Sequence, residues 1–158
     1  MVCNLKISKV DGRTLYRAIT ATTPALARRV IFVTTGVAGG MWAVGRLTHN
    51  DRLAETGRLA SEALIDSTIV TQASKFAFGR LRPAEGDGEG RFFKGGRSFF
   101  SGHSSASWSL ASVVACEYDD HPLAVVGAYG LASAVSLSRY TSRRHFLSDV
   151  FEIGRAHV

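Results

Sequence analysis

Apolar residues along this chain fall in long runs or recur at helical spacing, and no segment alternates apolar and polar residues as a strand does. A loop with five glycines, residues 84–100, interrupts the pattern near its middle. We therefore expect an all-α fold, a helical bundle whose last helix is truncated. The predicted helices cover residues 24–47, 51–81, 101–118 and 123–137, and a last one begins near residue 144.

Residues that start and stop helices support these boundaries. Pro24 suits a first helical turn. Asn50 or Asp51 can cap the second helix and Pro83 stops it, while Ser101 can cap the third.

The first predicted helix is a borderline membrane span. Its apolar core, residues 30–45, has 16 residues between Arg29 and Arg46, whereas a span needs about 20. A buried helix is the alternative. In either case its glycines permit close helix packing; they are Gly36, Gly39, Gly40 and Gly45.

A length of 158 residues indicates one domain, and the formal charge of +6 suits an anionic partner or an ordinary solvated basic surface. The two cysteines form neither a disulfide framework nor a CxxC pair, and no signal peptide is evident. We divide the chain into a polar segment (1–23), the domain proper (24–152) and a tail (153–158). The tail, IGRAHV, is what a common sequencing adapter encodes, so we expect it to be non-native.

Two segments carry groups suited to binding an anion. Lys75 and Arg82 are seven residues apart, which is two helical turns and predicts that both emerge from one face. Ser101, Gly102 and His103 stand where the glycine-rich loop enters a helix, and free N–H groups there point toward an anion. Taken singly, a basic helix end and an ordinary capped helix explain these residues as well.

A third segment contains Arg139, His145 and Asp149. His145 and Asp149 are four residues apart, so the carboxylate can reach one imidazole nitrogen and leave the other free to attack. A local surface pair is the alternative. Together the three segments supply cations, N–H donors, a nucleophile and an acid, which are the groups that phosphoryl transfer needs.

The motifs K-x6-RP (75–83), SGH (101–103) and SR-x5-H-x3-D (138–149) resemble those of the type 2 phosphatidic acid phosphatase (PAP2) family, which is related to vanadium haloperoxidases. The resemblance covers about half the chain and identifies it as a bacterial PAP2-like phosphatase, truncated at its carboxyl end. The family usually has proline before SGH, where this chain has Phe100.

The resemblance implies a role for each matching residue. His145 attacks phosphorus to form a phosphohistidine, Asp149 orients it, and His103 is the general acid. Phosphate is bound by Lys75, Arg82, Ser101, Gly102 and Arg139. It also implies no metal and no cofactor, with vanadate only for a haloperoxidase.

The implied activity is that of a metal-independent phosphomonoesterase acting on a lipid phosphate or an isoprenoid diphosphate. Alternatives are a soluble acid phosphatase of broad specificity and a vanadate-dependent haloperoxidase. A basic helical module that binds nucleic acid or acidic lipid leaves the positions of His103, His145 and Asp149 unexplained, so we expect no nucleic acid partner.

Membrane association is a separate expectation. The mean hydropathy of +0.07 and the charged residues of the second helix oppose burial in lipid, whereas the apolar runs of the first and fourth helices favour it. We expect a cell-envelope protein, of the inner membrane or the periplasm.

Overall fold

The computed structural model describes residues 33–85 and 88–156. Every regular element within these residues is a helix, which confirms the predicted all-α fold. The elements are a helix over residues 33–48, α2 (Asp51–Phe78), α3 (Gly102–Glu117), α4 (Pro122–Thr141) and α5 (Leu147–Ala156). Residues 24–32 of the first predicted helix lie outside the described part.

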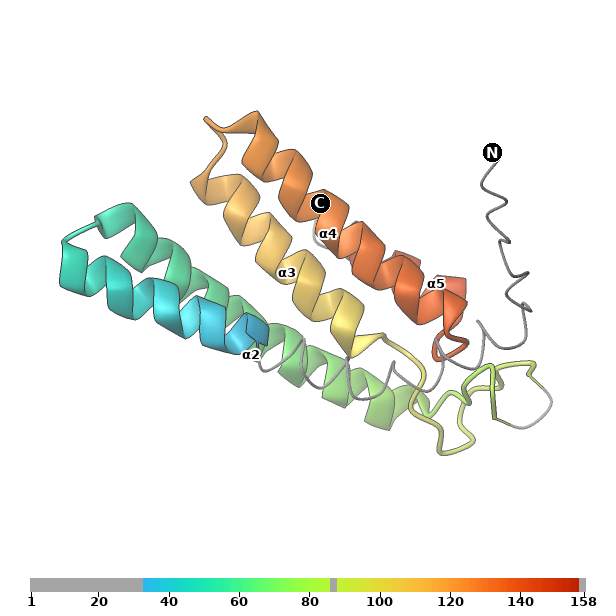
Figure 1. The fold of residues 1–158 in the computed structure, drawn as a ribbon. Helices are drawn as coiled ribbons and strands as arrows, with labels where there is room; N and C mark the ends of the chain where they lie inside the picture. The colour runs from blue at the N-terminus through green and yellow to red at the C-terminus, as the bar shows by residue number, and fades with distance from the viewer. Residues whose placement is uncertain (1–32, 86–87, 157–158) are drawn as a thin grey trace, which may run out of the picture.

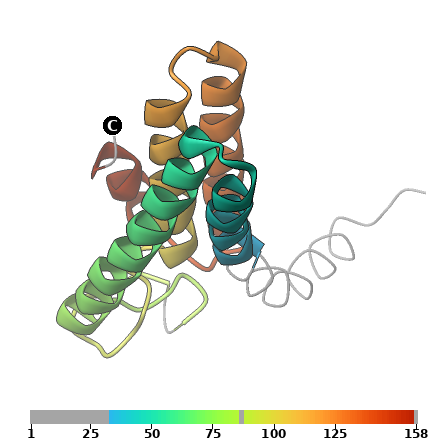
Figure 2. The ribbon, with the colours of Figure 1, turned by 90° about the vertical axis from the view of Figure 1, so that its left-hand side faces the viewer.

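Two helical hairpins make up most of the fold (Figure 1). Residues 33–48 pair with the first half of α2, and α3 pairs with α4. α3 packs against α2 on one side and α4 on the other, while α5 contacts α3 and α4. The glycine-rich loop lies at the end of the bundle opposite the hairpin turns, as both views show (Figures 1 and 2). That same end contains the end of α2 and the starts of α3 and α5.

The boundaries of α2 and α3 follow from their caps. Asn50 caps α2, since its side chain accepts a hydrogen bond of 3.0 Å from the Leu53 amide. The helix ends at Phe78 rather than at residue 81, because Gly79 adopts a left-handed conformation with φ +47° and stops it before Pro83 can. Ser101 caps α3, as its sequence position predicts.

The ends of α4 and α5 differ from the prediction. α4 continues past Leu137 to Thr141, and the hydroxyls of Ser138 and Thr141 on its last turns bond back to carbonyls of the preceding turn. α5 begins at Leu147 rather than near Arg144. The Asp149 carboxylate, in the first turn of α5, caps this start by accepting a hydrogen bond from the Phe146 amide. It runs to Ala156, through part of the segment predicted to be a tail.

Small residues bring the first hairpin close together. A Cβ atom added at Gly57 would lie 2.2 Å from the Trp42 amide nitrogen, and one at Gly45 would lie 2.3 Å from that of Ala54. The predicted role of glycine in close packing therefore holds for Gly45, whereas no atom of the described residues outside the surrounding helical turns lies within 4 Å of a Cβ built at Gly36, Gly39 or Gly40. The apolar core beside this contact consists of Ala38, Ala60 and Leu64, with Ala106, Leu110 and Val113 packed against it.

Among the described residues, no helix combines the length and the apolar character that a membrane crossing needs.

Candidate active site

The first predicted segment spans the end of α2. Lys75 lies on the last turn of that helix, but Arg82 lies in the loop beyond Gly79, so the prediction that both share one helical face is wrong. The two cations are nevertheless neighbours. Burial lowers the pKa of Lys75, and the positive charges of Arg82 and Arg97 lower it further.

These three cations form a positive cluster. Within the part of the chain that the structure describes, none of them makes an ion pair, and the buried Nε atom of Arg82 has no hydrogen-bond partner. The Glu85 carboxylate lies close to Arg82 but accepts from its backbone amide, at 3.1 Å, and not from its guanidinium. Cations that repel one another and are not engaged in ion pairs favour the binding of an anion.

The second segment meets the first at the start of α3. A Cβ atom added at Gly102 would lie 3.5 Å from Lys75 Nζ and 3.3 Å from Thr71 Cγ2, so the glycine lets α3 approach α2. Ser101 is fully buried, and its hydroxyl accepts hydrogen bonds from the amide and the hydroxyl of Ser104. It acts here as a helix cap.

A cavity of about 380 Å³ lies beside this junction, bordered by the helix over residues 33–48, α2 and α3. Lys75, Gly102 and His103 line it, and so does Thr71, whose buried hydroxyl has no partner among the described residues. The remaining lining includes a largely apolar stretch along α2 with Leu64, Ile65 and Ile69.

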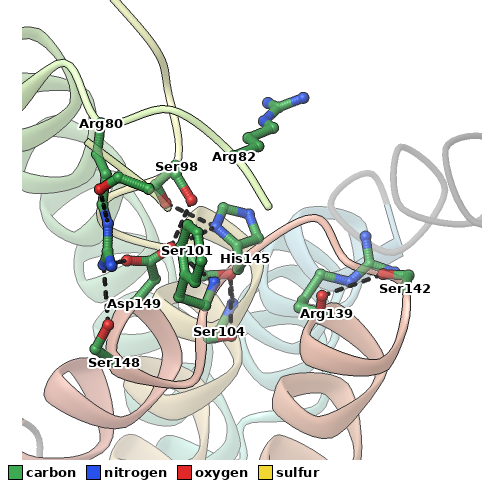
Figure 3. A network of polar contacts seen from close by, with 12 residues as sticks. Arg80, Arg82, Ser98, Ser101, Ser104, Arg139, Ser142, His145, Ser148 and Asp149 are labelled. Carbon is green, nitrogen blue, oxygen red and sulfur yellow. Dashed lines mark hydrogen bonds and ion pairs between the residues drawn. The ribbon is translucent and has the colours of Figure 1, made fainter. Parts of the chain in front are cut away.

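Asp149 joins the third segment to the other two (Figure 3). Its Oδ1 accepts a charge-assisted hydrogen bond from Arg80, and its Oδ2 accepts from the Ser98 hydroxyl and, at 2.9 Å, from the Phe146 amide. Its backbone carbonyl accepts from the Ser101 amide at 3.2 Å. The side chain is 0% exposed, so these bonds fix the carboxylate inside the protein.

The electrostatic surroundings keep this carboxylate charged. Burial acts to raise the pKa of Asp149, but the neighbouring His145, the Ser98 hydroxyl, the Phe146 amide and the Arg80 guanidinium outweigh burial. The net result is a pKa below that of an ordinary aspartate.

His145 is buried beside this carboxylate, but its hydrogen bond goes elsewhere. Its Nδ1 lies 2.7 Å from the Ser98 carbonyl oxygen and 3.8 Å from Asp149 Oδ2, which is too long for a hydrogen bond. A carbonyl oxygen only accepts, so Nδ1 of the neutral ring carries the proton and Nε2 keeps its lone pair. The expected direct bond to Asp149 is absent, because His145 precedes α5 instead of lying one turn away within it.

The remaining predicted ligands lie apart from His145. Arg139 is 7% exposed on the last turn of α4, and its Nε contacts the Ser138 hydroxyl at 3.4 Å. Burial, and then the charge of Arg144, lowers the pKa of Arg139. In Figure 3 the Arg82 guanidinium points away from the His145 ring, and Arg139 lies near Ser142.

The structure thus divides the predicted residues between two hollows. Lys75, Gly102 and His103 line the cavity described above. His145 lines a second hollow of about 450 Å³ with Pro83 and Tyr140, and the two share no lining residue.

Sequence reasoning missed three residues of this region, Arg80, Ser98 and Arg97. Arg80 and Ser98 contact Asp149, and Arg97 lies close enough to affect Lys75. The one available signal was the third cation inside the first motif, Arg80, between Lys75 and Arg82. A backbone carbonyl, which is the group that Ser98 offers to His145, leaves no mark in a sequence.

In the described part of the chain, no group of three or more His, Cys, Asp or Glu side chains is placed to hold a metal ion. A family model described as the PAP2 superfamily matches residues 58–152, a range that includes all three segments and more than half of the chain. No curated protein and no solved structure matches the chain.

Proposed function

Because the chain belongs to the PAP2 superfamily, we propose that it hydrolyses a phosphate ester through a covalent phosphohistidine. The observation that carries this proposal is the hydrogen bond of 2.7 Å between His145 Nδ1 and the Ser98 carbonyl. It leaves Nε2 with the lone pair that an attacking nitrogen needs.

In the first step, Nε2 of His145 attacks phosphorus and the bond from phosphorus to the leaving oxygen breaks. His103 donates a proton to that oxygen, so the product leaves as a neutral alcohol or as a phosphate monoanion. In the second step, water attacks the phosphohistidine, His103 accepts a proton from the water, and the phosphorus–nitrogen bond breaks. The result is inorganic phosphate and a regenerated His145.

Lys75, Arg82 and Arg139 hold the phosphoryl oxygens in this proposal, with the amide of Gly102. Ser101, expected to bind phosphate, is buried and supports the site as the cap of α3 instead. Among the described residues the positive cluster makes no ion pair and Nε of Arg82 has no partner, and both observations support an anion at this place. Phosphate binding must draw Arg82 and Arg139 toward His145, and an anion that several cations share provides the driving force.

The substrate we propose is amphiphilic, a lipid phosphate or an isoprenoid diphosphate. The cavity next to Lys75 and His103 supports this choice, because it continues along α2 past apolar residues. Its volume of about 380 Å³ exceeds the space that a phosphate group alone requires. Because His145 lines the other hollow, the phosphate in this proposal spans the two: it lies between Lys75 and Nε2 of His145, and the hydrocarbon chain occupies the apolar part of the cavity.

The test is phosphate release from phosphatidic acid, undecaprenyl diphosphate and p-nitrophenyl phosphate, each with and without chelator. His145→Ala is expected to lower kcat at least about 10³-fold, because it removes the nucleophile. His121→Ala, at an exposed turn position, is the matched control and is expected to retain activity. Equal activity of the two variants would refute the role of His145 as nucleophile. A preference for p-nitrophenyl phosphate over the two lipids would refute the proposal of an amphiphilic substrate.

We also propose a location in the cell envelope. Large apolar side chains exposed on α2 and α4, outside the cavity, support contact with lipid; they include Val70, Leu123, Val126 and Leu131. Fractionation without detergent tests this, and recovery of the protein wholly in the soluble cytoplasmic fraction would contradict it.

A further inference from the structure

Arg80 differs from the other cations of this region, because its donors already have protein partners. Its Nη1 donates to Asp149 and, at 2.9 Å, to the Ser148 hydroxyl. Its Nε donates to the Gly90 carbonyl at 3.0 Å. The side chain is 12% exposed, so it has little room to bind a substrate oxygen as well.

Two aromatic rings hold the guanidinium in place. Its central carbon lies 4.2 Å from the centre of the Phe146 ring and 4.7 Å from that of Phe92, both distances typical of cation–π contacts. Gly90 makes this possible, because a Cβ atom there would lie 2.4 Å from the Phe146 ring. The loop before α3 and the start of α5 thus build a fitted site for one arginine.

Asp149 needs such a partner, because a buried carboxylate without a compensating cation is unstable. Arg80 supplies the charge from one side, which leaves Oδ2 for the Ser98 hydroxyl. The Ser98 carbonyl then accepts the Nδ1 proton of His145. Arg80 and Ser98 of the loop before α3, together with Asp149 on α5, thus form a continuous hydrogen-bonded path from Arg80 to the imidazole, and its last link is the Ser98 backbone carbonyl (Figure 3).

We infer that Arg80 is a positioning residue, which acts through Asp149 and Ser98 to hold His145 in the orientation required for attack. Without Arg80, the imidazole is a hydrogen-bond donor that the carboxylate can turn to, since Nδ1 of His145 lies only 3.8 Å from Oδ2. The carboxylate would then compete with the Ser98 carbonyl for the Nδ1 proton and turn the ring. The inference relies on the proposed function only for what His145 does once it is held.

Nuclear magnetic resonance of protein labelled with ¹⁵N-histidine tests the positioning without any substrate. Arg80→Gln is expected to shift the Nδ1–H resonance of His145, or to lose it to exchange with water, while the resonances of His49 and His121 stay unchanged. Arg91→Gln is the matched control, because Arg91 lies in the same loop and pairs with the exposed Glu89. An unchanged His145 resonance in Arg80→Gln would overturn the inference.

Kinetics provide the second measurement. Arg80→Gln is expected to lower kcat about tenfold to a hundredfold with little change in KM, since small displacements of a reacting group have effects of this size. Adding Asp149→Asn should lower kcat no further than the worse single variant, because both residues act along one path. If the two single-variant losses in kcat multiplied in the double variant, Arg80 and Asp149 would act independently and the inference would be overturned. Equal losses of kcat in Arg80→Gln and Arg91→Gln would also overturn it.

Two further variants keep the inference testable if Arg80→Gln fails to fold. Arg80→Lys keeps the charge and should largely retain the His145 resonance, with an intermediate kcat. Ser98→Ala removes only the hydroxyl bond to Asp149 and should disturb the same resonance; an unchanged signal there would overturn the path. If the unaltered protein released phosphate from no substrate, the proposed function would fail while the resonance measurements still decided the role of Arg80.

Discussion

Replacing Asp149 with asparagine removes one buried charge and hardly changes the volume of the side chain. The amide nitrogen of asparagine cannot accept a hydrogen bond, and in the native protein both carboxylate oxygens accept. Whichever way the asparagine side chain turns, its nitrogen therefore faces one set of donors without accepting from it, either Arg80 or the Ser98 hydroxyl together with the Phe146 backbone N–H.

The size of the effect follows from these partners. Breaking a buried ion pair by neutralising one member destabilises a protein by about 3–5 kcal/mol, and a lost hydrogen bond to a charged group by about 1.5–3 kcal/mol. These terms overlap, and Arg80 keeps its contacts with two rings and with the Gly90 carbonyl. We expect a loss of about 3 kcal/mol, a large part of the roughly 5–15 kcal/mol by which a domain is stable.

Urea denaturation of the unaltered protein and of Asp149→Asn measures this loss as a fall in the midpoint of about 1–3 M, at slopes typical of small domains. Asp66→Asn, an exposed aspartate on α2, is the control and should change stability by less than about 0.5 kcal/mol. A loss below about 1 kcal/mol at pH 7 would refute the reasoning.

The same comparison has a pH dependence with a definite sign. The pKa of Asp149 is lower in the folded protein than in the unfolded chain, where it is about 3.9, so its stabilising contribution is complete above that value. As the pH falls below about 4 and toward the lowered pKa, the contribution is lost. The difference in stability between the two proteins should therefore shrink in acid, and an equal difference at pH 3 and pH 7 would show that the charge is not responsible.

Two other outcomes follow from the geometry. Gly57→Ala should destabilise the first hairpin by about 1–3 kcal/mol, since the added Cβ would meet the Trp42 backbone. Gly127→Ala on α4, where no described atom outside the surrounding helical turns lies within 4 Å of the added Cβ, is the control and should be neutral or stabilising by up to about 1 kcal/mol. Equal urea midpoints for the two variants would contradict the close contact. Inhibition by inorganic phosphate should weaken as the pH rises through the lowered pKa of Lys75. Lys75→Arg should remove that dependence, because a guanidinium stays charged. Identical pH profiles of inhibition in the unaltered protein and in Lys75→Arg would contradict a role for Lys75 in binding the anion.

The helices were predictable because their signals are local. Asn50 and Ser101 cap α2 and α3 as their sequence positions indicate. The errors occurred where two local signals competed. Pro83 is the stronger helix breaker, but Gly79 comes first and accepts the left-handed conformation without strain, so α2 stops there.

The candidate site was predictable as a set of segments but not as a set of contacts. Spacing indicated that His145 and Asp149 would meet directly, and this assumed that both lie on one helix. The turn before α5 breaks the assumption, and the Ser98 carbonyl takes the place of the carboxylate. Such contacts depend on how a loop folds back over 47 residues of chain, which no local pattern encodes.

The residues fully buried in this protein indicate how its two ends differ. The largest of them include Asp149, Ser98, Ser101 and Ser104, which lie around the start of α3 and are joined by hydrogen bonds, whereas the first hairpin depends on close packing of small residues such as Gly57. At the site end, the bonds that stabilise the fold are the same bonds that orient His145. Variants of Arg80, Ser98 and Asp149 should therefore lose stability and kcat per folded molecule together. Gly57→Ala should lose stability but keep its kcat per folded molecule, because its clash with Trp42 lies in the first hairpin, away from the imidazole.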